Sequence, residues 1–157
     1  EQAGGFVRCS GYRFPRCDFY HGRFLRHGNF YPHHVLRLFD RRHAGWHGDR
    51  EIHERVLNTG QTRRLRGDLL HYPYRDFSHE LDKLRGYARM MAEHRHAGDA
   101  KASYVKLLAS PCALFLRGYV LRLGFLDGLP GLIRHLNNAA YAFQKELYLF
   151  DLEPPGP

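Results

Sequence analysis

Cysteine is scarce in this chain, and its spacing matches neither a metal site nor a disulfide framework. The three cysteines, Cys9, Cys17 and Cys112, are odd in number and include no CxxC pair. This pattern excludes a zinc site built from paired cysteines and fits a reducing compartment. The sequence also shows no signal peptide and no apolar run that we judge long enough to cross a bilayer.

Lysine and acidic residues are few compared with arginine. Lysine occurs only at positions 83, 101, 106 and 145, and the net charge is +8. Such a charge points to an anionic partner: nucleic acid, a phosphorylated small molecule or an acidic membrane face. The arginines do not line one helix face, and there is no RNP-like strand, zinc-finger spacing or helix-turn-helix. We therefore expect no nucleic-acid partner.

The length of 157 residues, with 43% hydrophobic and 14% aromatic residues, predicts a folded domain with a real core. The chain starts at Glu1 without a methionine. The stretch Glu1–Gly5 resembles the end of a helix followed by its glycine stop. We therefore expect these residues to be part of a longer protein.

Residues 1–75 predict a mostly β region. We expect strands over Phe6–Tyr20, over Val35–Phe39 and around Glu54, with Gly11 and Pro15 forcing a bulge or an edge position in the first. Asn58-Thr59-Gly60 predicts a hairpin that leads into a return strand ending at His71.

Residues 76–151 change to helical periodicity. A helix is expected from Ser78, capped by Asp76 or Ser78 and stopped at Gly98, followed by a short helix over Ala100–Ala109 that ends at Pro111. The last helix is expected to bury one apolar stripe, and residues 152–157 form an unstructured tail. The stripe consists of Leu132, Leu136, Ala140, Phe143, Leu147 and Phe150.

The stretch Cys112–Phe125 is apolar on nearly all sides and is interrupted by Arg117 and Arg122. One interpretation is a helix that lies in a membrane interface, with both arginines reaching toward anionic headgroups. The alternative is an ordinary buried helix packed on the last one. The sequence leaves both open.

Glu54 is the candidate general base. If Ile52–Val56 is a strand, Ile52, Glu54 and Val56 share one face, so the carboxylate lies between two β-branched apolar neighbours. Desolvation raises the pKa of such a carboxyl group, which suits a base. The alternative is a structural glutamate at a sheet edge, paired with an arginine.

Two further stretches carry candidate binding residues. His21–Pro32 combines glycine, aromatic residues, Arg26 and His27, a mixture found where a chain approaches a sugar or a phosphate, although an ordinary surface loop has the same composition. His71 ends a predicted strand, where α/β enzymes collect ligands, but a single histidine is more often structural.

Five stretches in order resemble the C-terminal part of family 2 glycosyltransferases, and in particular bacterial enzymes that add glucose to the heptose of the lipopolysaccharide inner core. They are GYRFPRCDFYHGRFLRHGNFYP, VLRLFDRR, IHERV, LRGDLLHYPYRDFSHELDKLRGYARMMA and LRLGFLDGLPGLI. The resemblance implies an α/β fold: the C-terminal half of a GT-A (Rossmann-like) domain, with the acceptor and base side in residues 1–75. Amphipathic helices that contact a membrane surface would follow in residues 76–151.

The resemblance also implies roles for particular residues. Glu54 would be the catalytic base of an inverting transfer. Substrate would contact Arg26, His27, Arg37, His53 and Tyr72, and His71 would be a metal or diphosphate ligand. The implied partners are a nucleotide-sugar donor, a lipopolysaccharide core or other glycan acceptor, and the anionic inner face of the bacterial inner membrane. A divalent cation, Mg²⁺ or Mn²⁺, is the implied cofactor.

One departure from the family pattern limits the function that this chain has alone. No Asp-x-Asp motif, which binds the cation through carboxylate oxygens, occurs in the sequence, and the strand–helix units that hold the nucleotide have no counterpart. We therefore expect the chain alone to be inactive and to expose strand edges and apolar faces. The rival hypothesis is a non-catalytic basic module that binds an anionic membrane or nucleic acid.

Overall fold

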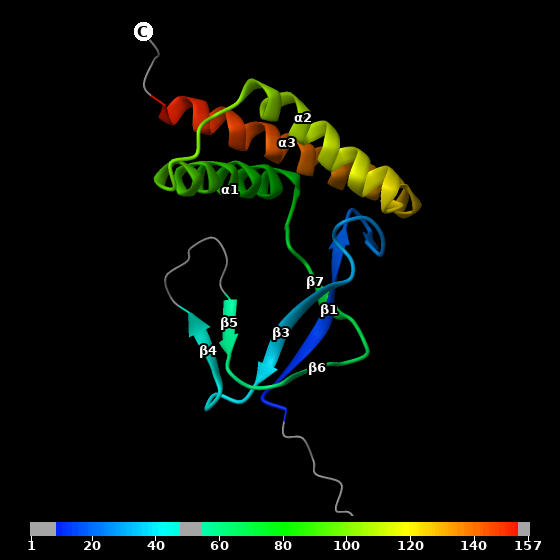
Figure 1. Ribbon diagram of the computed structural model, residues 1–157. Coiled ribbons are helices and arrows are strands. Elements are labelled where there is room, and N and C mark those ends of the chain that lie inside the picture. The colour runs from blue at the N-terminus through cyan, green and yellow to red at the C-terminus, as the bar shows by residue number, and fades with distance from the viewer. Residues whose placement is uncertain (1–8, 48–54, 154–157) are drawn as a thin grey trace, which may run out of the picture.

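A computed structural model of the chain describes residues 9–47 and 55–153, with a layer of strands below a layer of helices (Figure 1). All strands of this part lie between Gly11 and His71, and all helices lie between Phe77 and Leu152. The main sheet is mixed, so an α/β fold in the broad sense is confirmed. The more specific GT-A assignment stays a prediction.

Strand β1 (Gly11–Tyr20) organises the main sheet. Strands β2 (Arg23–Phe24) and β3 (His33–Phe39) pair with it antiparallel, while β6 (Thr62–Arg64) and β7 (Leu69–His71) pair with it parallel. The register with β3 shifts between Tyr12 and Arg13, next to the bulge expected at Gly11. The predicted extended segment is thus confirmed from Gly11 onward.

The predicted hairpin after Asn58 is wrong. Strands β4 (Ala44–His47) and β5 (Arg55–Asn58) pair in a small separate sheet, and the chain then crosses to β1. Gly60 permits this crossing because a Cβ there would lie 2.3 Å from Ser10 Oγ. The Ser10 hydroxyl donates to Asn58 Oδ1 at 2.8 Å, which ties the crossing to the start of β1.

Helix α1 (Phe77–Ala97) agrees with its sequence signals. Asp76 is the N-cap, its carboxylate accepts the backbone N–H of His79, and Gly98 is the C-cap. Leu84 and Ala88 are buried as the periodicity predicted, but Leu81 is 43% exposed. Local capping chemistry was therefore sufficient to define this helix.

The predicted helix end at Pro111 is wrong. Helix α2 (Tyr104–Phe115) continues through Pro111 into the π-helical turn η1 (Leu116–Leu121), and the 3₁₀ turn η2 (Gly124–Asp127) follows. A proline removes one N–H from a helix, and here α2 keeps its course because it packs along the last helix. The stretch Cys112–Phe125 is therefore three structures, not one helix.

The stripe predicted for helix α3 (Gly128–Leu152) is also wrong. Its buried residues are Gly131, His135, Ala142, Glu146 and Leu149, whereas Leu136, Phe143 and Leu147 are more than a third exposed. Helix α3 lies between α1 and α2 (Figure 1), so polar side chains on its inner side have partners on both neighbours. Arg95, for example, donates to Glu146 at 2.6 Å.

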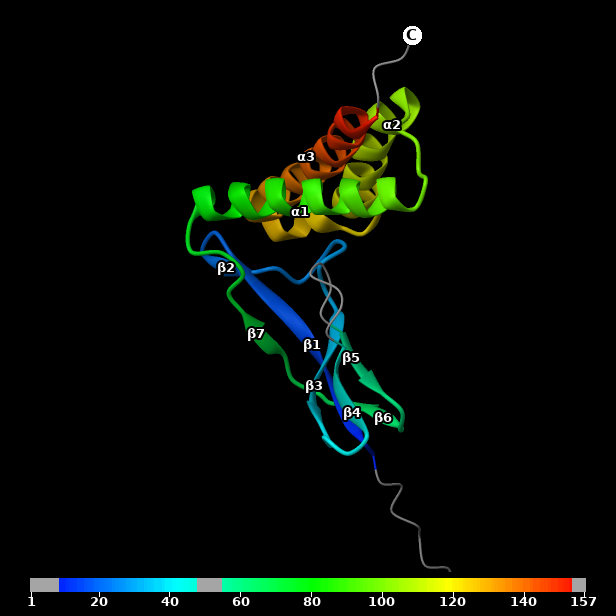
Figure 2. The ribbon, with the colours of Figure 1, turned by 90° about the vertical axis from the view of Figure 1, so that its left-hand side faces the viewer.

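The helices cover one end of the strand layer, not a face of the sheet (Figure 2). A buried carboxylate joins the layers: Glu80 of α1 accepts from Tyr20 of β1 at 2.6 Å and from Arg134 of α3 at 3.3 Å. The guanidinium of Arg134 also lies 4.5 Å from the ring centre of Phe30. Burial, followed by the bond to Glu80, raises the pKa of Tyr20 strongly, so the hydroxyl stays a donor.

Both sheets expose apolar side chains. Leu38 and Leu70 of the main sheet and Leu57 of the small sheet are each more than half exposed. This agrees with the expectation that the strand layer of the isolated chain exposes apolar surface.

Candidate functional site

The two residues at the centre of the sequence hypothesis, His53 and Glu54, lie outside the described residues. Strand β5 begins at Arg55, and Val56 is the one member of the predicted Ile52–Glu54–Val56 face that the structure describes. The role of Glu54 as a base therefore stays a prediction.

His71 forms a histidine–aspartate pair with Asp18. The parallel register of β1 and β7 sets these residues opposite each other, and His71 Nδ1 lies 2.8 Å from Asp18 Oδ1. Asp18 is 3% exposed, while the His71 side chain is 41% exposed. Because Asp18 lies at Nδ1, Nε2 is the ring nitrogen of His71 that remains to contact a ligand.

Asp127 forms the second such pair, with His27. The carboxylate of this 1% exposed residue lies 2.9 Å from His27 Nδ1 and also accepts the backbone N–H groups of Arg26 and His27. Asp127 ends η2 at the start of α3, so it fixes the loop after β2 on the helical layer. Charge-assisted bonds of this kind are about twice as strong as neutral ones.

Asp68 completes the arrangement. It accepts from Arg26 at 2.8 Å and from the Tyr31 hydroxyl at 2.9 Å, and these bonds raise the pKa of both donors. The buried thiol of Cys17 lies close enough to Asp18, Asp68, Asp127 and Arg26 to feel all four charges, although burial is the main cause of its raised pKa. We call Asp18, Asp68 and Asp127 with their partners Arg26, His27, Tyr31 and His71 the carboxylate cluster.

The cluster has a simple electrostatic design. Its three carboxylates are mostly buried, whereas the side chains of Arg26 and His27 are 53% and 38% exposed. The buried carboxylates therefore position the guanidinium of Arg26 and the imidazole of His27 at the protein surface. Such an edge suits an anionic or hydroxyl-rich ligand.

Of the other predicted contacts, Tyr72 borders this cluster, whereas Arg37 lies on β3 opposite the start of β1, at the other end of that strand from Asp18. Tyr72 is 64% exposed and packs against Phe19 and Phe24, with its ring centre 5.1 Å from that of Phe19. Arg37 is exposed on β3 near His33, whose pKa is lowered first by burial and then by the charge of Arg16. Tyr72 follows His71 directly, so the aromatic group borders the Asp18–His71 pair.

The described residues do not form a metal site. No group of three or more histidine, cysteine, aspartate or glutamate side chains in residues 9–47 and 55–153 could hold an ion. The carboxylate of Asp18 already contacts His71 Nδ1, and no third described side chain lies close enough to these two to complete a metal site. The described residues do not fit the implied cation by themselves, so we derive no chemical step through one.

The imidazole ring of His135 packs against the loop that contains Gly28. This buried ring packs against three glycines: a Cβ on Gly28, Gly118 or Gly124 would lie within 2.6 Å of it. Gly28 also has a positive φ of 79°, which favours glycine. The loop therefore approaches the helices too closely for any other residue.

We predict a pH dependence from this buried ring. Burial, followed by the charge of Arg134, lowers the pKa of His135 below its ordinary value, so the unfolded chain binds this proton more readily than the folded one. Stability should then fall as the pH drops below about 6.5, by up to about 1.4 kcal/mol per pH unit for one proton. Urea unfolding at neutral and mildly acidic pH measures this change in the free energy of unfolding.

The control for this prediction compares His135→Gln with His94→Gln, a change at an exposed position of α1. The first should lower stability at neutral pH but reduce its further loss on acidification, whereas the second should leave the pH dependence unchanged. An unchanged pH dependence in His135→Gln would contradict the assignment.

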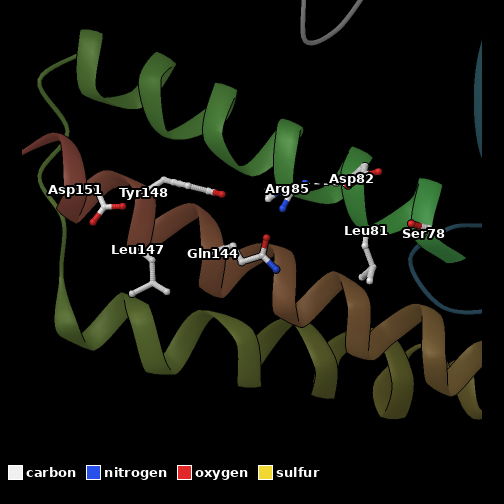
Figure 3. Close-up of a pocket in the computed structure, with 8 residues that line it drawn as sticks. All are labelled: Ser78, Leu81, Asp82, Arg85, Gln144, Leu147, Tyr148 and Asp151. Carbon is white, nitrogen blue, oxygen red and sulfur yellow. Dashed lines mark hydrogen bonds and ion pairs between the residues drawn. The ribbon is translucent and has the colours of Figure 1, made fainter.

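A separate groove of about 510 Å³ runs between α1 and α3 (Figure 3). An exposed ion pair, Arg85–Asp82, and two leucines from the two helices form its walls. The lining residues are Ser78, Leu81, Asp82, Arg85, Gln144, Leu147, Tyr148 and Asp151. None of the predicted site residues lies in this groove.

Sequence reasoning found the surface members of the cluster and missed its carboxylates. Arg26, His27, His71 and Tyr72 were predicted as candidates, whereas Asp18, Asp68 and Asp127 were not. A signal was available, because Asp18 and Asp127 each stand in an apolar sequence, Cys-Asp-Phe-Tyr and Phe-Leu-Asp-Gly. An isolated carboxylate in such a setting indicates a buried, paired group.

The amino-acid sequence is similar to that of a known enzyme. The lipopolysaccharide core biosynthesis glycosyltransferase LpsC of Rhizobium meliloti (strain 1021) is 28% identical over 109 residues. The similarity is to a glycosyltransferase. It covers 69% of this chain but 40% of LpsC, so the chain spans less than half the length of that relative. No family model matches the chain, and no solved structure matches it.

Proposed function

We propose that these residues form the acceptor side of a glycosyltransferase that moves a sugar from a nucleotide-sugar donor to a lipopolysaccharide core or a related cell-envelope glycan. The single observation that carries the proposal is the similarity to LpsC over 109 residues. The proposed enzyme belongs to family 2, transfers glucose with inversion and works with a divalent cation whose ligands lie mainly outside this chain.

In this proposal Glu54 removes the proton from the acceptor hydroxyl as that oxygen attacks the anomeric carbon. Loss of the proton makes the oxygen a stronger nucleophile, and the nucleotide diphosphate leaves from the opposite face of the sugar. His53 and Arg37 would contact the acceptor or the diphosphate. The neighbouring apolar residues Ile52 and Val56 would keep the carboxylate basic.

The described cluster fits acceptor binding. Arg26 and His27 are cationic or imidazole groups on a loop fixed by Asp127, which favours contact with phosphorylated core saccharide. Tyr72 exposes an aromatic ring beside His71, and a sugar ring can pack on such a surface. Because their positions are set by buried carboxylates, these groups need little reordering on binding.

The test is binding by the isolated 157-residue chain. We expect it to bind a heptose-containing core oligosaccharide, measured by calorimetry, and not to bind a nucleotide sugar, since no Asp-x-Asp is present. Tyr72→Ala should weaken oligosaccharide binding about tenfold, because an exposed stacking contact is lost. Leu38→Ala is the matched control, because Leu38 is also more than half exposed but lies on β3.

Three outcomes would count against the proposal. Tight binding of a nucleotide sugar by the isolated chain would assign it the donor side instead. Equal oligosaccharide affinity in the Tyr72→Ala and Leu38→Ala variants would remove Tyr72 from the site. Binding to neither ligand by a folded chain would reject the acceptor role altogether.

A further inference from the structure

The segment from Tyr104 to Leu129 presents a continuous apolar face to solvent. Helix α2 has no buried residue, although its sequence is strongly apolar. Its exposed large apolar side chains continue through η1 and η2 to the first turn of α3. We call them the apolar face: Tyr104, Val105, Leu108, Leu116, Val120, Leu121, Leu123, Phe125, Leu126 and Leu129.

The exposed charges within this segment have one sign. Between Asp99 and Asp127 the sequence contains no acidic residue, and Asp127 itself is buried. The same segment carries four exposed cations: Lys101, Lys106, Arg117 and Arg122. Surfaces of soluble domains usually intersperse both signs and avoid large apolar patches. Apart from Glu153, which accepts the backbone N–H of Ala102 at 2.6 Å, the charges next to the apolar face are cations, and such a face is complementary to anionic lipid.

The packing of α2 distinguishes between a helix that spans a bilayer and one that lies on its surface. Tyr104–Leu121 is a helix of 18 residues that is long and apolar enough to span a membrane, by length and composition only. However, one side of it packs on α3, where Tyr104 contacts Phe150 and the backbone N–H of Ser103 donates to buried Glu146. Spanning would strip these contacts and carry Lys106 and Arg117 into the hydrocarbon, so lying on the surface is favoured.

Helix α2 is also the helix farthest from the strand layer, on the outer side of α3 (Figure 1). Apart from the contact of Tyr104 with Phe150, the exposed side of α2 therefore points away from the other helices and the strands. A flat membrane surface can reach α2 without touching the sheet.

We propose that the apolar face lies on an anionic phospholipid membrane. The apolar side chains enter the boundary between headgroups and acyl chains, and Lys101, Lys106, Arg117 and Arg122 contact lipid phosphates. This binding does not depend on sugar transfer.

The proposal also connects the membrane to the carboxylate cluster. The backbone N–H of Gly28 donates to the carbonyl of Arg122 at 2.9 Å, and Asp127 at the end of η2 holds Arg26 and His27. The loop with the exposed cations therefore sits directly against the membrane-facing segment. A saccharide attached to a lipid in the same surface would meet this loop without leaving the membrane.

Vesicle binding of the 157-residue chain tests the proposal. We expect co-sedimentation with vesicles of phosphatidylcholine and phosphatidylglycerol, and weaker binding to phosphatidylcholine alone. Leu116→Glu should reduce the partition coefficient at least about tenfold, since one inserted leucine is replaced by a charge. Lys106→Gln should reduce it about fivefold on anionic vesicles and leave phosphatidylcholine binding unchanged.

The matched control is Leu38→Glu, because Leu38 and Leu116 are both 54% exposed and Leu38 lies on β3. It should bind vesicles like the wild type. Circular dichroism of each variant separates loss of binding from loss of folding. Absence of vesicle binding by the folded wild type would overturn the proposal, as would equal binding of Leu116→Glu and Leu38→Glu. Self-association abolished by Leu116→Glu, without vesicle binding, would reassign the face to a second copy.

Discussion

Asp127→Ala should lower the free energy of unfolding by about 3–5 kcal/mol, because it removes a buried carboxylate and leaves its donors without a partner. The carboxylate accepts two backbone N–H groups and contacts His27 Nδ1 within 3.2 Å. For a chain of this length the melting temperature should fall by roughly 10 °C. Chemical denaturation followed by circular dichroism measures the loss.

The comparison for this prediction is Asp82→Ala on α1. Asp82 also forms an ion pair, with Arg85, but both side chains are about two-thirds exposed, so its removal should cost less than about 0.5 kcal/mol. Asp127→Asn, which keeps one acceptor oxygen, should fall between the two. If Asp127→Ala were as stable as Asp82→Ala, the loop after β2 would not depend on Asp127.

Glu54→Gln should reduce turnover by about 10²–10⁴-fold in a longer protein that joins these residues to a donor-binding region, because glutamine cannot accept the proton. The KM for the nucleotide sugar should stay the same, since the base acts on the acceptor. Single-turnover transfer of a radiolabelled sugar measures the chemical step directly.

Glu51→Gln is a suitable control, as it makes the same chemical change three residues earlier in the chain. It should retain wild-type turnover. Normal turnover in Glu54→Gln would return this residue to the structural interpretation, a glutamate paired with one of the many arginines. A fall in both variants would indicate a general effect of charge in this segment.

The elements that the sequence predicted well are those determined by local chemistry. Helix α1 begins at its Asp76 cap and ends at Gly98, because a capping carboxylate and a glycine act within one turn of the chain. The extended character of β1 and β3 was also predicted from the sequence, although neither strand alternates strictly between buried and exposed residues.

The failures arise where distant packing outweighs local signals. Pro111 was expected to end a helix, yet α2 passes through it because packing on α3 holds the helix along its length. In α3, contacts from two sides bury His135 and Glu146 instead of Leu136 and Leu147. Neither the second neighbour nor the parallel pairing of β6 and β7 with β1 can be recognised from periodicity.

In the candidate site, too, the sequence predicted some residues and missed others. The exposed residues Arg26, His27, His71 and Tyr72 were identified by residue type and resemblance, which report surface chemistry. The buried carboxylates that hold them come from positions about 50 and 100 residues apart in the chain, Asp18, Asp68 and Asp127. Their proximity is a property of the fold, and no spacing rule in the sequence contains it.

The most direct test of the proposed function is sugar transfer itself. A longer protein that contains these 157 residues and a donor-binding region should transfer glucose from a nucleotide-glucose donor to a heptose-containing core oligosaccharide, with the isolated chain as the comparison. We expect turnover by the longer protein and none by the isolated chain. Transfer by the isolated chain, or no transfer by the folded longer protein with any nucleotide-sugar donor, would contradict the proposed function.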